Sequence, residues 1–209
     1  MSQSQVKLFR QALHKKMGTY DSELSGEGQT ALATYYELLL RWNERLHLVA
    51  PCSAEDFATK HVLESLTLTT RFPTDAKIVD IGSGAGLPII PCLIVRPDIN
   101  ATLIESSQKK SVFLREALKV IGALKRANIV TKPFEQSTPP DAQFVTCRAL
   151  DDFGSKVRLL IQWAPLNSTL FLFGGSNLRQ RLSETNYAFN EWLLPGSDQR
   201  FLFEVKRVM

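Results

Sequence analysis

The pattern of apolar and polar positions changes its period at about residue 72. Before this point, apolar residues recur at three- and four-residue steps, as between Leu32 and Leu46, and this spacing predicts amphipathic helices. A further apolar group between Val62 and Leu68 predicts another helix that ends near residues 71–73. No convincing strand pattern occurs in this part, so the N-terminal third is expected to be helical.

From Lys77 onward, short apolar runs alternate with amphipathic segments. Strands are predicted over 77–81, 101–105, 128–131, 144–147, 169–173 and 201–205, and helices over 89–96, 107–122, 151–163 and 176–185. Because the strand runs are almost wholly apolar, they suit a buried parallel sheet. The alternation predicts right-handed βαβ units in a doubly wound α/β fold. The turn at 195–198 leaves no room for a helix after the segment AFNEWLL, so the last two strands should form a hairpin with an antiparallel terminal strand.

Composition places the chain among ordinary globular proteins, with 44% hydrophobic and 22% charged residues over 209 positions. No apolar run approaches the ~20 residues of a membrane span, and the first 20 residues do not resemble a secretory signal. The three cysteines are too scattered for a disulfide framework, and with the three histidines they give no zinc-like spacing. A cytoplasmic protein without a metal site is expected.

The net charge of +4 is distributed unevenly. Residues 1–20 carry four basic side chains and no acidic one, and residues 107–126 carry six basic groups against Glu116 alone. Such clusters attract polyanions, of which nucleic acid is the commonest inside cells. A single cluster is equally well explained as a solvated helix face. Two clusters in one small chain favour RNA or DNA as a partner.

The motif Asp80-x-Gly82-x-Gly84-x-Gly86-Leu87 follows the first predicted strand and leads into a helix. Glycines at this point permit a tight turn and let the backbone approach a ligand closely. A dinucleotide-binding loop would place Leu87 at its third glycine, and a Walker loop would need a Gly-Lys pair that is absent. The spacing instead resembles the first motif of class I S-adenosylmethionine-dependent methyltransferases. A plain βα turn would not require three alternating glycines.

Glu105 adds a second element to this motif. It ends the next predicted strand, 19 residues after Gly86, where a carboxylate can accept both hydroxyls of a ribose. The loop, its strand and this distal acid together predict a nucleoside-containing cofactor.

A wider set of motifs resembles the ribosomal RNA small subunit methyltransferase G family, also called glucose-inhibited division protein B. The similarity runs from about residue 35 to the C-terminus. It is carried by WN (42–43), KHVLESL (60–66), DIGSGAGLP (80–88), IES (104–106), KKSVFL (109–114), FE (134–135), CRA (147–149) and SDQR (197–200).

The resemblance implies a cytoplasmic enzyme that uses S-adenosylmethionine to methylate N7 of a guanine in 16S rRNA, either free or in an assembling small subunit. A monomer is expected. The resemblance also implies a seven-stranded Rossmann-like class I methyltransferase sheet over 75–209 behind an N-terminal helical cap over 1–74. Carried over by position, the cofactor-binding residues are Asp80, Gly82, Gly84, Gly86, Leu87, Glu105, Phe134, Glu135 and Arg148. The RNA-binding residues are Lys60, His61, Lys109, Lys110, Arg148 and Arg200.

Three positions depart from the family pattern. Phe173-Gly174-Gly175 lacks the usual lysine, the segment 46–49 reads LHLV rather than YNLT, and Ile89 replaces a glycine. These changes bear on RNA affinity or substrate identity more than on cofactor binding.

The chemistry of N7 methylation requires no general base, because this nitrogen carries an in-plane lone pair and no proton. Alignment, exclusion of water and tolerance of positive charge are the tasks that remain. Accordingly, no catalytic residue is assigned. Arg148 could orient a phosphate or the O6 edge of guanine, or it could instead form a salt bridge with Asp151 or Asp152.

Three other interpretations stay open. Cys147 in a Thr-Cys context could be the nucleophile of a cytosine-C5 RNA methyltransferase, although a buried core cysteine explains it better. The chain could be an RNA-binding protein that keeps the fold without turnover, or a nicotinamide-dependent oxidoreductase, which the loop register disfavours. His61 is a packing residue or a site residue, and Trp163 and Trp192 are expected in the core.

Overall fold

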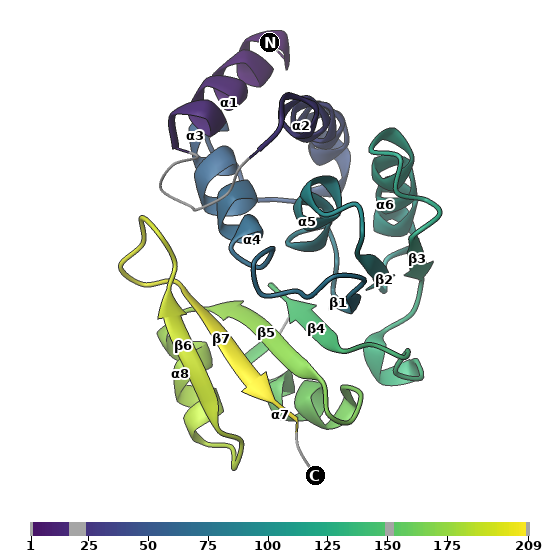
Figure 1. Cartoon of the computed structure of the whole chain (residues 1–209), viewed down its shortest axis with the longest axis vertical. Coiled ribbons are helices and arrows are strands. Elements are labelled where there is room, and N and C mark those ends of the chain that lie inside the picture. The colour runs from purple at the N-terminus through teal and green to yellow at the C-terminus, as the bar shows by residue number, and fades with distance from the viewer. Residues whose placement is uncertain (1, 17–23, 149–152, 208–209) are drawn as a thin grey trace.

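In the computed structural model, residues 2–16, 24–148 and 153–207 are described, and their strands form one seven-stranded sheet in the order β3-β2-β1-β4-β5-β7-β6 (Figure 1). The strands are β1 (Lys77–Ile81), β2 (Asn100–Ile104), β3 (Ala127–Val130), β4 (Phe144–Cys147), β5 (Thr169–Gly174), β6 (Phe189–Leu193) and β7 (Phe201–Lys206). Strands β1 to β5 pair in parallel, and β7 runs antiparallel to both β5 and β6. The predicted hairpin and antiparallel terminal strand are thereby confirmed.

The helices are α1 (Ser2–Lys16), α2 (Gly26–Leu46), α3 (Ala54–Asp56), a π-helical turn (Phe57–Leu63), α4 (Glu64–Leu66), α5 (Ile89–Val95), α6 (Gln108–Val120), a 3₁₀ turn (Phe134–Gln136), α7 (Phe153–Trp163) and α8 (Ser176–Ser183). Segments α3, the π-helical turn and α4 follow one another without a break. A π-helical turn is rare and is frequently found at functional sites.

Two hydrophobic clusters cover the two faces of the sheet. One joins α1, α2, α5 and α6 to side chains such as Ile78 and Phe171. The other joins α7 and α8 to the alternate strand positions, such as Val79 and Leu170. Side chains of a strand alternate between faces, so a sheet that is apolar at every position is buried on both sides. The result is a three-layer α/β/α arrangement, with α1 and α2 packed outside one helical layer (Figure 1).

Two expectations from the sequence are wrong. The helix that contains Val62 ends at Leu66 rather than near 71–73, because Thr67 and Thr69 turn their hydroxyls onto the carbonyls of Glu64 and Leu66, each at 2.7 Å. Trp192 is 37% exposed and lies outside the core. It sits on an edge strand, where the Arg71 guanidinium lies 4.0 Å from its ring centroid.

Candidate functional site

The pairing register brings three distant segments to one edge of the sheet. Ile81 at the end of β1 pairs with both Ile104 of β2 and Cys147 of β4. The residues that follow these three strand ends, namely Gly82, Glu105 and Arg148, therefore emerge side by side. Ligands of open α/β sheets bind at this carboxyl edge.

The glycine loop after β1 has a conformation that glycine adopts without strain. Gly82, Gly84 and Gly86 have φ values of 66°, 47° and 84°. The backbone N–H groups of Gly82 and Ser83 donate to the Ile104 carbonyl at 2.9 and 3.2 Å, which ties the loop to β2. From α2, the buried Tyr35 hydroxyl donates to the Ala85 carbonyl at 2.6 Å. The loop is held from two sides.

Two of these glycines serve different purposes. A Cβ atom on Gly86 would lie 2.2 Å from Cδ1 of Ile90, so this glycine lets the helix α5 pack against the loop. A Cβ atom on Gly84 would meet only the Gly82 carbonyl oxygen at 3.6 Å and the Glu105 carboxylate at 4.0 Å. Gly84 therefore leaves free space beside the loop, whereas Gly86 makes room for a packed side chain.

Glu105 is fixed by backbone hydrogen bonds on both carboxylate oxygens. Its Oε2 accepts from Gly84 N and its Oε1 accepts from Ser107 N, each at 2.8 Å. The residue is 6% exposed. Each carboxylate oxygen accepts more than one hydrogen bond, so both remain able to receive a pair of adjacent hydroxyl groups.

A first cavity of about 470 Å³ opens above the loop. Seven residues predicted from the sequence line it, namely His61, Gly82, Gly84, Leu87, Glu105, Lys110 and Arg148. The wall formed by Leu48–Ala50 was not among the predicted site residues, although Leu48 and Val49 belong to the segment that departs from the family pattern. Asn43 of the WN pair could have pointed to this wall, because its side chain binds the segment directly. The Asn43 side chain accepts a hydrogen bond from Val49 N at 2.9 Å and donates one to Val49 O at 3.1 Å. That amide fixes the segment that follows α2.

A second cavity of about 390 Å³ lies next to the first and shares the lining residues Gly82 and Ser106 with it. Phe134 and Glu135, which the sequence predicts to bind the cofactor, are among its lining residues. Phe134 is 3% exposed and packs edge-on against Trp163, and Glu135 forms an ion pair with Lys156 at 3.1 Å. A ligand that contains a nucleoside and an amino acid could span the two cavities across Glu105.

Asp80 and Gly86 line neither cavity. Asp80 is fully buried behind the loop, and its Oδ1 accepts from the Thr146 hydroxyl at 2.7 Å. Its Oδ2 has no hydrogen-bond partner within the described part of the chain. Burial raises the pKa of this carboxyl to about 7, and the nearby Glu105 charge acts in the same direction.

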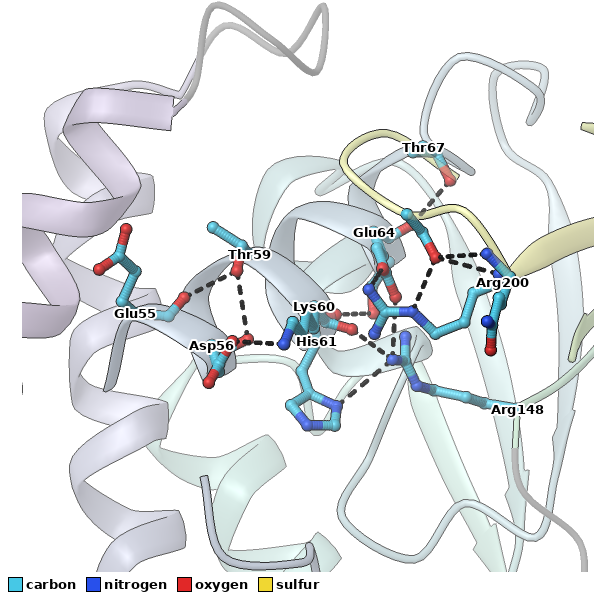
Figure 2. Close-up of polar contacts among 12 residues, drawn as sticks. Glu55, Asp56, Thr59, Lys60, His61, Glu64, Thr67, Arg148 and Arg200 are labelled. Carbon is cyan, nitrogen blue, oxygen red and sulfur yellow. Dashed lines mark hydrogen bonds and ion pairs between the residues drawn. The ribbon is translucent and has the colours of Figure 1, made fainter. Parts of the chain in front are cut away.

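Arg148, Arg200 and Glu64 form an ion-pair cluster beside the first cavity (Figure 2). The buried Glu64 carboxylate lies 3.1 Å from Arg148 Nη2 and 2.8 Å from Arg200 Nη2. Arg148 Nη2 also donates to the Lys60 carbonyl and lies 3.3 Å from His61 Nδ1. Of the two interpretations of Arg148, an ion pair is observed, but with Glu64. Asp151 and Asp152 lie outside the described residues.

The remaining predicted RNA-binding residues differ in their surroundings. Lys60 is exposed and pairs with Asp56 at 2.7 Å, and Lys109 is exposed in the first turn of α6. Burial, together with the charge of Arg148, lowers the pKa of His61 to about 4. His61 is therefore neutral near pH 7.

Cys147 is fully buried at the end of β4. Burial raises the pKa of its thiol well above the ordinary value. A nucleophilic cysteine needs the opposite shift, so the environment supports the core interpretation of this residue. Within the described ranges, no group of three or more metal-ligating side chains comes together, and no helix is long and apolar enough to cross a membrane.

Known proteins resemble this chain in sequence and in fold. Residues 28–192 match the family model described as rRNA small subunit methyltransferase G. The Ribosomal RNA small subunit methyltransferase G of Gluconobacter oxydans is 36% identical over 68% of this chain and 69% of its own length. That of Paracoccus denitrificans is 32% identical over 77% of this chain and 82% of its own length. An RNA methyltransferase from Salinibacter ruber, solved with S-adenosyl-L-homocysteine, shares the fold with a TM-score of 0.56 and 16% identity, covering 70% of this chain and 90% of that chain.

Proposed function

The chain belongs to the rRNA small subunit methyltransferase G family, and we propose that it transfers the methyl group of S-adenosylmethionine to N7 of a guanine in 16S rRNA. The observation that carries the proposal is the position of Glu105. Two backbone N–H groups fix its carboxylate on the lining of the first cavity, next to a loop that Gly84 keeps free of side chains.

The two cavities adjoin at Gly82 and Ser106, so each can take one half of this cofactor. Glu105 would accept the ribose hydroxyls, and Phe134 and Glu135 would border the adenine in the second cavity. The backbone of Gly82 and Gly84 would border the amino-acid part. Bound there, S-adenosylmethionine supplies a methyl group on a positively charged sulfur.

The residues around the first cavity suit a nucleophile that carries no proton. The purine N7 lone pair forms the new N–C bond, and the electron pair of the broken S–C bond stays on sulfur, so no proton has to move. His61 is neutral and partnered by Arg148, and Cys147 is buried as a thiol. The chain contributes alignment and exclusion of water rather than a base.

The test is the loss and recovery of a single modification. N7-methylated guanosine is opened by borohydride, and aniline then cleaves the strand, so the site appears as a break in 16S rRNA. The break should be absent from a strain that lacks this protein and should return with the wild-type chain. It should not return with Gly84→Val, whose side chain would occupy the cavity.

Gly122→Val is the matched control for backbone strain. Gly122 also has a positive φ, of 70°, but it lies after α6, away from the cavities, and a Cβ atom added there would have no neighbour within 4 Å. This variant should restore the break. Persistence of the break in the deletion strain, with loss of a methylated cytosine instead, would refute the proposal. No change in any rRNA modification would favour an RNA-binding protein without turnover.

A further inference from the structure

The helix α1 carries basic side chains and no acidic one. Lys7, Arg10 and Lys15 are exposed and Lys16 is half-buried, and among the described residues none of the four forms an ion pair. Glu55 of α3 lines the same surface hollow as Lys15 without pairing with it. On a solvated helix face, basic residues usually alternate with acids three or four positions away. A solvated face therefore does not explain the composition of α1.

The opposite face of α1 is fully used in packing. Phe9 and Leu13 have no exposed surface. The Phe9 ring stacks on Tyr36 of α2, with centroids 4.5 Å apart, and lies 6.0 Å from the ring of Phe57. A basic amphipathic helix that binds a lipid surface or the groove of another protein needs its apolar face free. In α1 only the charged face remains for a ligand.

The same aromatic cluster connects α1 to the first cavity. Phe57 begins the π-helical turn, and its ring centroid is 5.2 Å from that of His61, which lines the first cavity. The helix α1 also packs beside α3, at the start of this continuous helical segment (Figure 1). The basic face and the cavity therefore have fixed relative positions, so one long ligand can contact both.

The backbone of RNA has the chemistry that this face requires. Lysine and arginine contact phosphate oxygens regardless of the base sequence, and each phosphate that they neutralise releases counterions. Lys7 and Arg10 are three positions apart, so they lie on the same side of the helix, about 5 Å apart along its axis. The helix lies outside residues 28–192, which the family model matches, so that match assigns it no role.

We propose that α1 is a phosphate-binding helix that holds the RNA substrate by its backbone, away from the nucleotide that is methylated. The inference rests on the function proposed above for the identity of the RNA. It adds a contact surface outside the two cavities. This surface raises the affinity for RNA and takes no part in methyl transfer.

The test measures RNA affinity as a function of salt. The protein is the double variant Lys7→Gln/Arg10→Gln, and the ligand is a labelled synthetic 16S rRNA fragment that contains the guanosine located by the cleavage assay. Loss of two phosphate contacts should reduce the slope of log affinity against log salt concentration by about 1.4–1.8 and weaken binding by about 25- to 60-fold at about 0.1 M salt. At saturating S-adenosylmethionine, KM for the fragment should rise while kcat stays unchanged.

Two further proteins serve as controls. Lys125→Gln/Lys206→Gln removes the same charge at the amino edge of the sheet, from exposed lysines that form no ion pair within the described chain. It should keep the wild-type slope. Lys7→Arg/Arg10→Lys keeps both charges of α1 and should also keep the slope, which separates a loss of charge from a disturbance of the helix.

Equal slopes and affinities for the α1 variant and the amino-edge variant would overturn the inference, because α1 would then be a solvated face. A lower kcat with an unchanged KM would also overturn it, since α1 would act on the cavity rather than on RNA. So would lost binding to phosphatidylglycerol vesicles with intact RNA affinity, which would assign the face to a lipid surface.

The same preparations separate this inference from the proposed function. If the wild-type chain binds the fragment without methylating it, the proposed function fails, and the salt slopes still decide the role of α1. If the wild-type chain binds no RNA, both fail.

Discussion

Alanine at three positive-φ glycines should separate a glycine needed by the cofactor from one needed by the fold. Gly84, Gly86 and Gly122 have φ values of 47°, 84° and 70°, so an alanine at each costs about 1–2 kcal/mol in backbone strain. Only at Gly86 does the new Cβ collide with a core side chain, at 2.2 Å from Ile90 Cδ1. Displacing Ile90 adds about 1–3 kcal/mol, which gives a total of about 2–5 kcal/mol for Gly86→Ala.

Thermal unfolding of the cofactor-free chain measures the first consequence. At about 2–4 °C per kcal/mol for a chain of this size, Gly84→Ala and Gly122→Ala should each lower Tm by about 2–8 °C, and Gly86→Ala by about 4–20 °C. Calorimetry measures the second consequence. Gly84→Ala should lose at least about 10-fold in affinity for S-adenosylmethionine, because the methyl group enters the first cavity, whereas Gly122→Ala should bind normally.

Two results would refute this reasoning. One is a Tm loss for Gly84→Ala as large as that for Gly86→Ala, which would mean that Gly84 is also a packing position. The other is unchanged cofactor affinity in Gly84→Ala, which would mean that the loop does not approach the ligand closely.

Three further changes have expected outcomes. His61 has a folded-state pKa of about 4, below its unfolded value, so it contributes stability above pH 6.5 that is lost as the pH falls towards 4. In denaturant titrations, the free energy of unfolding of wild type relative to His61→Gln should therefore drop by about 2–3 kcal/mol over that range. The pH dependence from Asp80 has the opposite sign, because its folded-state pKa is raised to about 7 and the charged form is disfavoured in the fold. The free energy of unfolding of Asp80→Asn should therefore rise relative to that of wild type between pH 4 and pH 7, and a constant difference between the two proteins would contradict the raised pKa. Lys109→Gln should reduce the slope of log affinity for 16S rRNA against log salt concentration by about 1, whereas Lys119→Gln, at the other end of α6, should leave this slope unchanged. Equal effects of the two substitutions would mean that Lys109 does not contact an RNA phosphate.

Local chemistry made the glycine loop and its strands predictable from the sequence. Three alternating glycines after an apolar β-branched run have few explanations other than a tight loop at a strand end, and the loop has the positive φ values that only glycine adopts freely. The parallel sheet could also be predicted, because strands buried on both faces are apolar at every position. Once the sheet is parallel, Glu105 must emerge beside the loop, since the two strand ends lie at the same edge.

The polar cluster was decided by the tertiary structure alone. Arg148 and Glu64 are 84 positions apart, and nothing local distinguishes Glu64 from an exposed helical glutamate. Their contact exists because the residue that follows β4 meets the helix that contains the π-helical turn when the chain folds, and the position of that helix depends on the hydrophobic cluster in which its apolar side chains are buried. The same holds for the wall at Leu48–Ala50. The sequence by itself determined the loop, the acid and the sheet that aligns them, because these follow from backbone conformation and strand periodicity. The partners of the buried charges depend on which distant surfaces meet when the core closes.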